Sequence, residues 1–172
     1  MIFVTLGTHR DPMPRLINAL SGLSADQLVV QHGTSPPPAR AARTVAFMSF
    51  DEMLACFEAA DVVVTHAGVG SVLSATRVGH SPIVVPRLRR LGEHVDDHQV
   101  ELTRALAERR MVRPVWEVED LPGAVAAYPA RNARAPQGVE RPIHVAVREA
   151  LRGEGPTKRI GRRPRARLRA RR

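Results

Sequence analysis

The sequence predicts an α/β domain built on a doubly wound parallel sheet. Short apolar runs alternate along the chain with segments whose apolar residues recur at helical spacing. The apolar runs are continuous, which is typical of strands that helices cover on both faces. The chain has 172 residues, enough to bury the core of one such domain.

The first part of the chain predicts a strand, a helix and two further strands. Residues 2–6 form an apolar run that stops at Gly7. Residues 11–20 have helical spacing, with their prolines near the start, where proline is tolerated. Residues 28–31 and residues 44–47 are apolar runs separated by a proline-rich loop, so each predicts a strand.

The centre of the chain predicts two helices, each followed by a strand. Ser49 and Glu52 have the three-residue spacing of a capping box, so we expect a helix to begin there. Residues 61–65 then predict a buried strand, and residues 71–78 predict a second helix. Residues 82–85 predict the next strand, which ends at a proline.

The last part of the periodic pattern predicts a long helix over residues 95–109, a strand over residues 112–115 and a helix over residues 119–127. Beyond it, proline, alanine, glycine and arginine dominate. We therefore expect one domain over residues 1–128, followed by a mostly disordered tail over residues 129–172.

The positive charge of the chain lies in that tail. Residues 130–172 hold fourteen of the 26 Lys and Arg residues and three acidic residues. A solvated extension without function is one interpretation, and attraction to an anionic membrane surface is the other. Nucleic acid is an unfavoured partner, because residues 130–172 contain no aromatic side chain and the rest of the chain is slightly acidic. Within residues 130–172 we expect at most one short helix, near residues 145–151.

The composition also predicts a cellular compartment. The single cysteine, Cys56, excludes an internal disulfide and favours a reducing environment. The first residues lack the basic start and the long apolar run of a signal peptide. We expect a cytoplasmic protein.

A glycine turn carries the main functional signal. Gly68 and Gly70, followed by Ser71, stand between a predicted strand and a predicted helix. Such a turn lets the backbone approach a ligand and aims the first helical amides at a phosphate. An ordinary strand-to-helix turn is the alternative. A dinucleotide fingerprint is less favoured, since Leu73 replaces its third glycine, although nearby arginines could hold a 2′-phosphate.

Further candidate residues follow the strand before the glycine turn and the first strand, at the same predicted edge of the sheet. His66 stands just before the glycine turn and is a candidate for a sugar, phosphate or catalytic contact, or for a bond to a loop carbonyl. Gly7 and Thr8 follow the first strand and form either a ligand contact or a simple turn.

A polar cluster lies at the start of the predicted helix over residues 95–109. His98 and Gln99 suit hydrogen bonds to vicinal hydroxyls. Asp96 and Asp97 are better explained as charges that complement the helix dipole. His94 and His98 with an aspartate are a weak metal signal, so we expect neither a metal nor a cofactor.

Taken together, these motifs resemble the C-terminal, donor-binding half of family-28 glycosyltransferases. The resemblance covers roughly residues 1–125 and is closest to free-standing subunit versions of that half, which act in dolichol-linked N-acetylglucosamine transfer and in bacterial exopolysaccharide synthesis. It is carried by the opening IFVTLGT, the segment from Met53 through the glycine turn, the strand before Pro86, and the residues Glu93, His94, His98 and Gln99.

The resemblance implies a Rossmann-like domain that forms one half of a GT-B glycosyltransferase. Gly68, Gly70 and Ser71 would hold the diphosphate of a UDP-sugar, and the segment at Phe50 would approach the uracil. His98 and Gln99 would meet the sugar, with Glu93 beside them. Larger relatives carry a glutamate for the ribose where this chain has Ser74, which leaves ribose recognition open.

The function that this resemblance implies is sugar transfer to a lipid-linked acceptor by an inverting, metal-independent enzyme. One domain supplies one wall of a ligand cleft, and no residue stands out as the general base. We therefore expect a membrane-anchored partner subunit that holds the acceptor, at the inner face of the cell membrane. The alternative classes are a non-catalytic nucleotide-sugar-binding regulator and a nucleic-acid-binding protein that acts through its tail.

Overall fold

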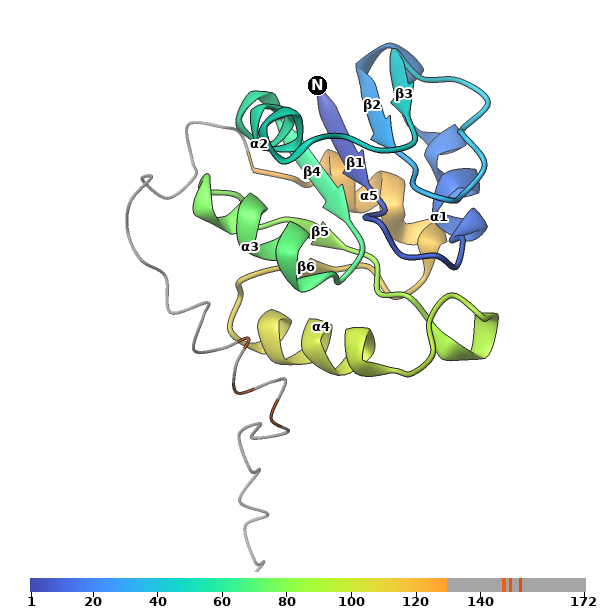
Figure 1. Cartoon of the computed structure of the whole chain (residues 1–172). Helices are drawn as coiled ribbons and strands as arrows, with labels where there is room; N and C mark the ends of the chain where they lie inside the picture. The colour runs from blue at the N-terminus through green and yellow to red at the C-terminus, as the bar shows by residue number, and fades with distance from the viewer. Residues whose placement is uncertain (130–146, 148, 150–151, 153–172) are drawn as a thin grey trace, which may run out of the picture.

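The structure is a computed structural model that describes residues 1–129 and also residues 147, 149 and 152. Within these residues six strands form one parallel sheet in the order β3-β2-β1-β4-β5-β6 (Figure 1). The strands are β1 (Ile2–Thr5), β2 (Leu28–Gln31), β3 (Arg43–Val45), β4 (Val62–Thr65), β5 (Ile83–Val84) and β6 (Arg113–Pro114). From β1 the strands β2 and β3 are added on one side, whereas β4, β5 and β6 are added on the other side. The strand order therefore reverses between β1 and β4, and in sheets of this kind ligands bind at that point.

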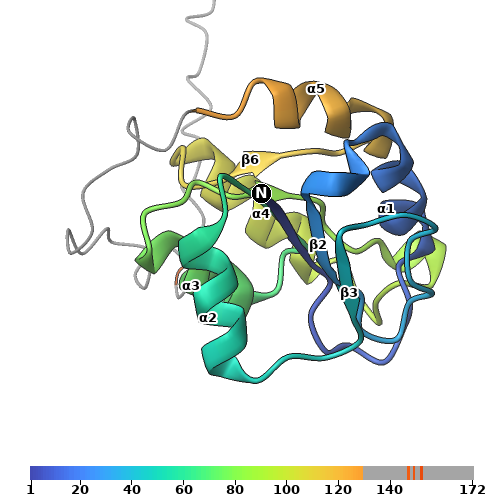
Figure 2. The same ribbon diagram turned by 90° about the horizontal axis from the view of Figure 1, so that it is seen from above.

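Helices cover both faces of this sheet. The α-helices are α1 (Pro14–Ala19), α2 (Phe50–Ala59), α3 (Val69–Arg77), α4 (His98–Glu108) and α5 (Leu121–Ala126). Short 3₁₀ turns connect them, namely η1 (Leu20–Gly22), η2 (Ala25–Gln27), η3 (Arg89–Leu91) and η4 (Val118–Asp120). Seen from above, α2 and α3 lie on one side of the sheet and α5 lies on the other (Figure 2). The predicted fold class, a doubly wound α/β domain, is confirmed.

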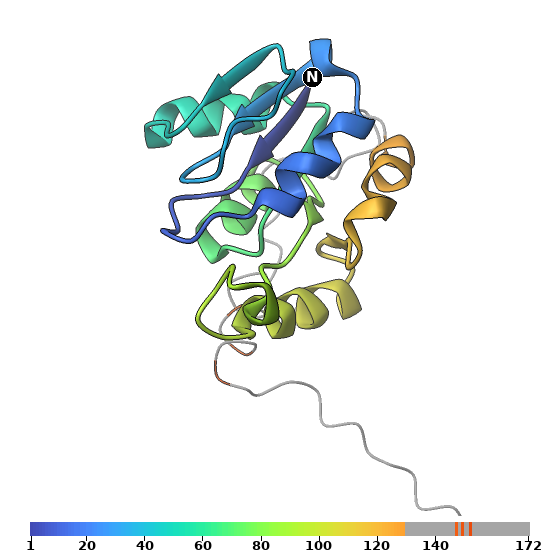
Figure 3. The ribbon, with the colours of Figure 1, turned by 90° about the vertical axis from the view of Figure 1, so that its right-hand side faces the viewer.

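The strands form because successive apolar residues enter two different cores. Phe3 and Val63 pack with residues of α2 and α3 on one face. Val4 and Val64 pack with residues of α1 and α5 on the other face. Figure 3 shows this division from the side, with α1 and α5 along one face and α2 along the other. A third cluster joins α3 and α4 around Val84 of β5.

The start of α4 differs from the prediction. A helix was expected from residue 95, but α4 begins at His98, and Val95 is 62% exposed. Gly92, just before this segment, ends η3 in the left-handed conformation, with φ 69°. The Asp96 amide then donates to Nδ1 of His94 at 3.4 Å, and the His98 amide donates to the Asp96 carboxylate at 3.1 Å. Such local side-chain bonds compete with helical ones, so the first predicted turn does not form.

Other predicted boundaries shift by one to three residues. The strand expected over residues 44–47 ends at Val45, which leaves Phe47 exposed. The first helix begins at Pro14, because proline suits the first helical position and disfavours helix in the residue before it. The expected capping box is present: Ser49 Oγ accepts from the Glu52 amide, and the Glu52 carboxylate accepts from the Ser49 amide.

Most of the predicted tail, including most of the helix expected near residues 145–151, lies outside the described residues. Val147 is buried against the cluster around α4, and the Arg109 guanidinium donates to the Glu149 carboxylate. Among the described residues, no helix has both the length and the apolar character needed to cross a bilayer.

Candidate functional site

A pocket of about 300 Å³ lies where β1 and β4 end, at the reversal point of the sheet. Seven predicted binding residues line it: Gly7, Thr8, Phe50, His66, Gly68, Gly70 and Ser71. Four further residues, which were not predicted to bind a ligand, complete the lining: Gln31, Met48, Met53 and Ser74. The structure therefore unites residues from four segments that are far apart in the chain.

The glycine turn opens α3 at one wall of this pocket. Gly68 is the N-cap residue in an extended conformation, and no side chain caps the helix. The first amides of an α-helix have no acceptor within the helix, and they carry its positive dipole end. A Cβ atom added at Gly70 would meet no heavy atom within 4 Å. The wall therefore offers amide donors and open space, which suits an anionic ligand.

The ring of His66 forms the floor between two glycines. A Cβ atom at Gly68 would lie 2.1 Å from Nε2 of His66, and one at Gly7 would lie 2.4 Å from its Cε1. Gly7 also has a φ of 71°, which side chains rarely adopt. Both positions therefore require glycine, because the imidazole occupies the space that a side chain would need.

Burial sets the protonation state of His66. The ring is enclosed, and burial together with the nearby Arg87 charge lowers its pKa to about 4. At neutral pH the imidazole is therefore uncharged and is a weak proton acceptor. A packing or positioning role therefore suits it better than general-base catalysis.

Gln31 fixes the loop that carries Gly7. Its Oε1 accepts from Thr5 Oγ1 at 2.6 Å and from the Gly7 amide at 3.1 Å. Its Nε2 donates to the carbonyls of Gly7 at 2.9 Å and Ala46 at 2.7 Å. A glutamine at the end of an otherwise apolar strand was the signal in the sequence that could have identified this positioning residue.

Apolar side chains form the outer wall of the pocket. Phe50 and Met53 lie one turn apart on α2, and Met48 precedes that helix. Phe50 is 60% exposed, although its side chain is large and hydrophobic. A flat ligand group such as a nucleobase could cover this surface.

Glu93 does not line the pocket. Its carboxylate forms two hydrogen bonds with the Arg15 guanidinium of α1, at 2.8 and 3.0 Å, and accepts from the Leu88 amide at 3.0 Å. The side chain is 2% exposed. In the structure Glu93 thus anchors the loop after β5 to α1, and its predicted role in substrate binding stays a prediction.

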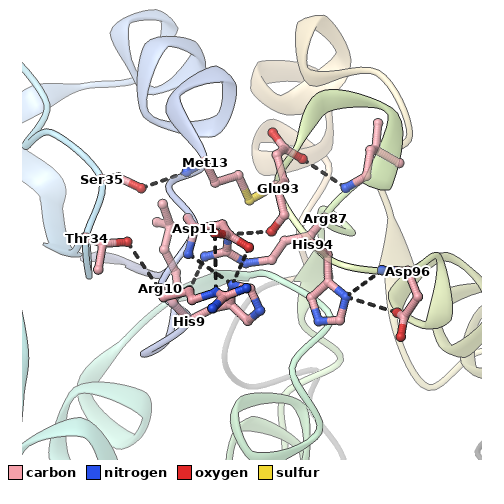
Figure 4. A network of polar contacts seen from close by, with 12 residues as sticks. His9, Arg10, Asp11, Met13, Thr34, Ser35, Arg87, Glu93, His94 and Asp96 are labelled. Carbon is pink, nitrogen blue, oxygen red and sulfur yellow. Dashed lines mark hydrogen bonds and ion pairs between the residues drawn. The ribbon is translucent and has the colours of Figure 1, made fainter.

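Arg87 lies at the centre of a buried network beside the pocket (Figure 4). Its guanidinium donates to the carbonyls of Asp11 at 2.6 Å, Leu6 at 3.0 Å and Glu93 at 3.1 Å. Burial lowers the pKa of Arg87, whereas the Glu93 carboxylate opposes that shift. Because these carbonyls occupy the guanidinium, Arg87 is poorly placed to hold the 2′-phosphate of a dinucleotide.

Two imidazoles stack at the edge of this network. The rings of His9 and His94 lie 4.7 Å apart between centroids, with 29° between their planes. Burial, and then the Arg87 charge, lower the pKa of His9. His94 Nδ1 lies 2.9 Å from the Asp96 carboxylate. The pair joins the loop after β1 to the loop after β5, a contact that the sequence did not reveal.

The two predicted sugar-binding residues lie on α4, outside the pocket lining. His98 has an exposed ring whose Nδ1 lies 3.9 Å from the carboxylates of Asp96 and Glu101. Gln99 is buried, and its Oε1 accepts from the Arg87 amide at 3.1 Å. Neither side chain lines the pocket that begins at the glycine turn. Their contact with a sugar therefore stays a prediction.

A larger hollow, of about 810 Å³, shares no lining residue with this pocket. It lies between α1 and the loop at residues 36–40, and Arg40 is the charged residue in its lining. Within the part of the chain that the structure describes, no three His, Cys, Asp or Glu side chains gather where they could hold a metal ion.

Known proteins with similar sequences are glycosyltransferases or parts of them. The profile of the glycosyltransferase family 28 C-terminal domain matches residues 1–137. The UDP-N-acetylglucosamine transferase subunit ALG13 of Yarrowia lipolytica is 31% identical over 101 residues, which are 55% of this chain and 50% of that protein. The chain thus spans about half the length of the curated relative that it matches.

Among solved structures, the calicheamicin glycosyltransferase CalG4 is similar, with a TM-score of 0.45 and 19% identity over 90% of this chain and 40% of that chain. The profile match extends through every described strand and helix from β1 to α5 and includes the whole pocket. The chain therefore belongs to the glycosyltransferase family 28 C-terminal domain family.

Proposed function

We propose that this chain is the donor-binding subunit of an inverting glycosyltransferase. It would move a hexosyl or N-acetylhexosaminyl group from a UDP-sugar to a lipid-linked acceptor, in polysaccharide or glycolipid synthesis. Family membership and the printed name of the Yarrowia relative, a UDP-N-acetylglucosamine transferase subunit, support this proposal.

The observation that carries the proposal is the pocket at the start of α3. Gly68, Gly70 and Ser71 line it, and space is open in front of Gly70. A diphosphate placed there would accept from helical amides, with the positive end of the helix dipole behind them. The apolar wall at Phe50 would then take the nucleobase, and the sugar would extend toward the loop after β5.

The same groups would stabilise the leaving group during transfer. The acceptor hydroxyl would attack the anomeric carbon in line, its oxygen forming the new bond as the bond to the diphosphate breaks. Negative charge develops on the departing UDP, where the amides of α3 are already oriented. The proposal assigns this stabilisation to α3 instead of a metal ion.

The proton of the acceptor hydroxyl requires a base on the opposite side of the sugar. The buried His66 is a weak base, since its pKa is lowered to about 4. We therefore assign the general base and the acceptor site to a partner subunit, which would also carry the membrane anchor. This would place the complex at the inner face of the cell membrane.

Calorimetric titration of the full chain tests the donor site. We expect saturable binding of UDP, UDP-N-acetylglucosamine or UDP-glucose, and no binding of NADPH. Gly70→Asp places a carboxylate against the diphosphate and should abolish binding. Gly123→Asp is the matched control, since a Cβ atom at Gly123 of α5 also meets nothing within 4 Å. Binding of NADPH alone would overturn the proposal.

Reconstitution with the partner separates an enzyme from a regulator. Transfer of the sugar to a lipid-linked acceptor by the two chains together, lost in Gly70→Asp, is the result expected of an enzyme subunit. Binding without transfer, in a complex that holds both chains, would identify a non-catalytic nucleotide-sugar-binding regulator instead.

A further inference from the structure

We propose that this pocket selects its ligand by the diphosphate and hardly discriminates between uridine, 2′-deoxyuridine and thymidine. The chain should then bind 2′-deoxyuridine diphosphate and thymidine diphosphate nearly as well as uridine diphosphate. This inference rests on the function proposed above, because it states which nucleotides the same pocket accepts.

Three of the five polar side chains in the pocket lining carry neutral hydroxyls. They belong to Thr8, Ser71 and Ser74. Doubly wound nucleotide sites commonly hold the ribose diol with a carboxylate. A bond between two neutral groups is about half as strong as one to an ionised group. Loss of the 2′-hydroxyl should therefore change the affinity only modestly.

The two other polar side chains of the lining are already occupied or enclosed. Gln31 uses both ends of its amide in four bonds to Thr5, Gly7 and Ala46. The ring of His66 is enclosed between Gly7 and Gly68. Neither side chain is positioned to discriminate between a ribose and a deoxyribose.

The carboxylates of α2 lie on other faces of that helix. Phe50 and Met53 are three residues apart, which places both on the face that lines the pocket. Asp51 and Glu52 stand between them and are turned away by the helical repeat. Both hydrogen bonds that Ser49 donates, from its amide and from its hydroxyl, go to the Glu52 carboxylate.

The wall that faces the nucleobase distinguishes weakly between uracil and thymine. Met48, Phe50 and Met53 present thioethers and an aromatic ring. Methionine adapts to different shapes, and an added methyl group gains contact with such a wall. The 5-methyl group of thymine is therefore accepted, while the amides of α3 bind the same diphosphate in every case.

Calorimetry of the full chain with UDP, dUDP and dTDP tests this inference. We expect the three dissociation constants to lie within about tenfold of one another. A preference for UDP of more than tenfold over either deoxynucleotide overturns the inference and leaves the proposed function standing. Failure of all three nucleotides to bind overturns the proposed function, and this inference with it.

A gain-of-function variant locates the ribose. Ser74 lies four residues after Gly70, on the same face of α3, and is partly exposed in the pocket. Ser74→Glu should raise the preference for UDP over dUDP by at least about tenfold, through a carboxylate that accepts from the diol. Ser74→Gln, of the same length and uncharged, should not. An unchanged ratio in Ser74→Glu, with thermal unfolding as in the wild type, overturns the placement of the ribose beside α3.

Discussion

The ring of His66 occupies the space in which a side chain at Gly68 would lie. A Cβ atom at Gly68 would stand 2.1 Å from Nε2 of His66, far inside contact distance. The strand β4, which ends one residue before His66, and the helix α3, which begins just after Gly68, are thereby held together beside the pocket. The glycine turn thus serves the packing of His66, in addition to the ligand contact proposed for it.

The first prediction separates the two glycines of the turn. Gly68→Ala should destabilise the fold by about 1–3 kcal/mol, because an enclosed ring has to move. Gly70→Ala should be neutral or stabilising by about 0.5–1 kcal/mol, since its Cβ meets nothing within 4 Å inside a helix. Urea denaturation measures both. Equal effects of the two substitutions would contradict the packing of His66 against Gly68.

The second prediction concerns pH. Burial lowers the pKa of His66 from 6.5 to about 4. Between these values the unfolded chain binds a proton that the folded chain excludes, so stability falls as the pH is lowered from 6.5 to 4. The loss should approach about 3 kcal/mol at pH 4.

Urea denaturation across this range in the wild type and in His66→Gln measures the effect. The variant should lose the part of the pH dependence that His66 causes, and His98→Gln, which alters an exposed ring, is the control. The same slope in His66→Gln as in the wild type would show that another group is responsible.

The third prediction concerns the ion pair that anchors the loop after β5. Arg15 and Glu93 have side chains 16% and 2% exposed, so removal of Arg15 leaves a buried carboxylate unpaired. Arg15→Met should cost about 3–5 kcal/mol of stability. Arg10→Met is the control, because the Arg10 side chain is 82% exposed and its ion pair should contribute about 0–1 kcal/mol. A small effect of Arg15→Met would contradict an anchoring role.

The fourth prediction tests the sugar contact expected of His98. If the exposed ring meets the sugar, His98→Ala should weaken binding of UDP-N-acetylglucosamine by about tenfold and leave binding of UDP unchanged, because only the first ligand carries the sugar. Parallel titrations of the two ligands measure the ratio. An equal loss for both, or no loss, would rule out the sugar contact.

The fifth prediction concerns the basic tail. Residues 158–172 hold nine Lys and Arg residues and no acidic residue. Each such charge near an anionic bilayer contributes about 1 kcal/mol, and salt screens the attraction. The full chain should bind vesicles that contain phosphatidylserine and dissociate at high salt. A variant with these nine residues changed to Gln should not bind, and binding that persists in it would assign the effect to another surface.

The local parts of the fold could be predicted because their signals are short-range. The capping box at Ser49 lies within four residues, and the structure forms it as expected. Continuous apolar runs predicted the parallel strands, since strands buried on both faces lack alternation. The helix start at residue 95 was predicted wrongly because bonds among His94, Asp96 and His98 compete with helical ones.

The candidate site could be predicted where it follows from the position of the strand ends. Gly7 and Thr8, His66, and the glycine turn all follow the carboxyl ends of β1 and β4, so they converge in any parallel sheet of this order. The positioning role of Gln31 was missed, because its partners belong to segments before and after it in the chain.

The sequence by itself determined the fold class, the edge of the sheet that carries the pocket, and the family. All three follow from hydrophobic periodicity and short motifs, which involve residues close together in the chain. Only the tertiary structure decided that Glu93, His98 and Gln99, which follow β5, lie outside the lining of the pocket. Glu93 turns inward because Arg15, 78 positions earlier, supplies its counter-charge in a buried place. No local pattern encodes such a pairing, since it exists only once α1 and the loop after β5 have packed together.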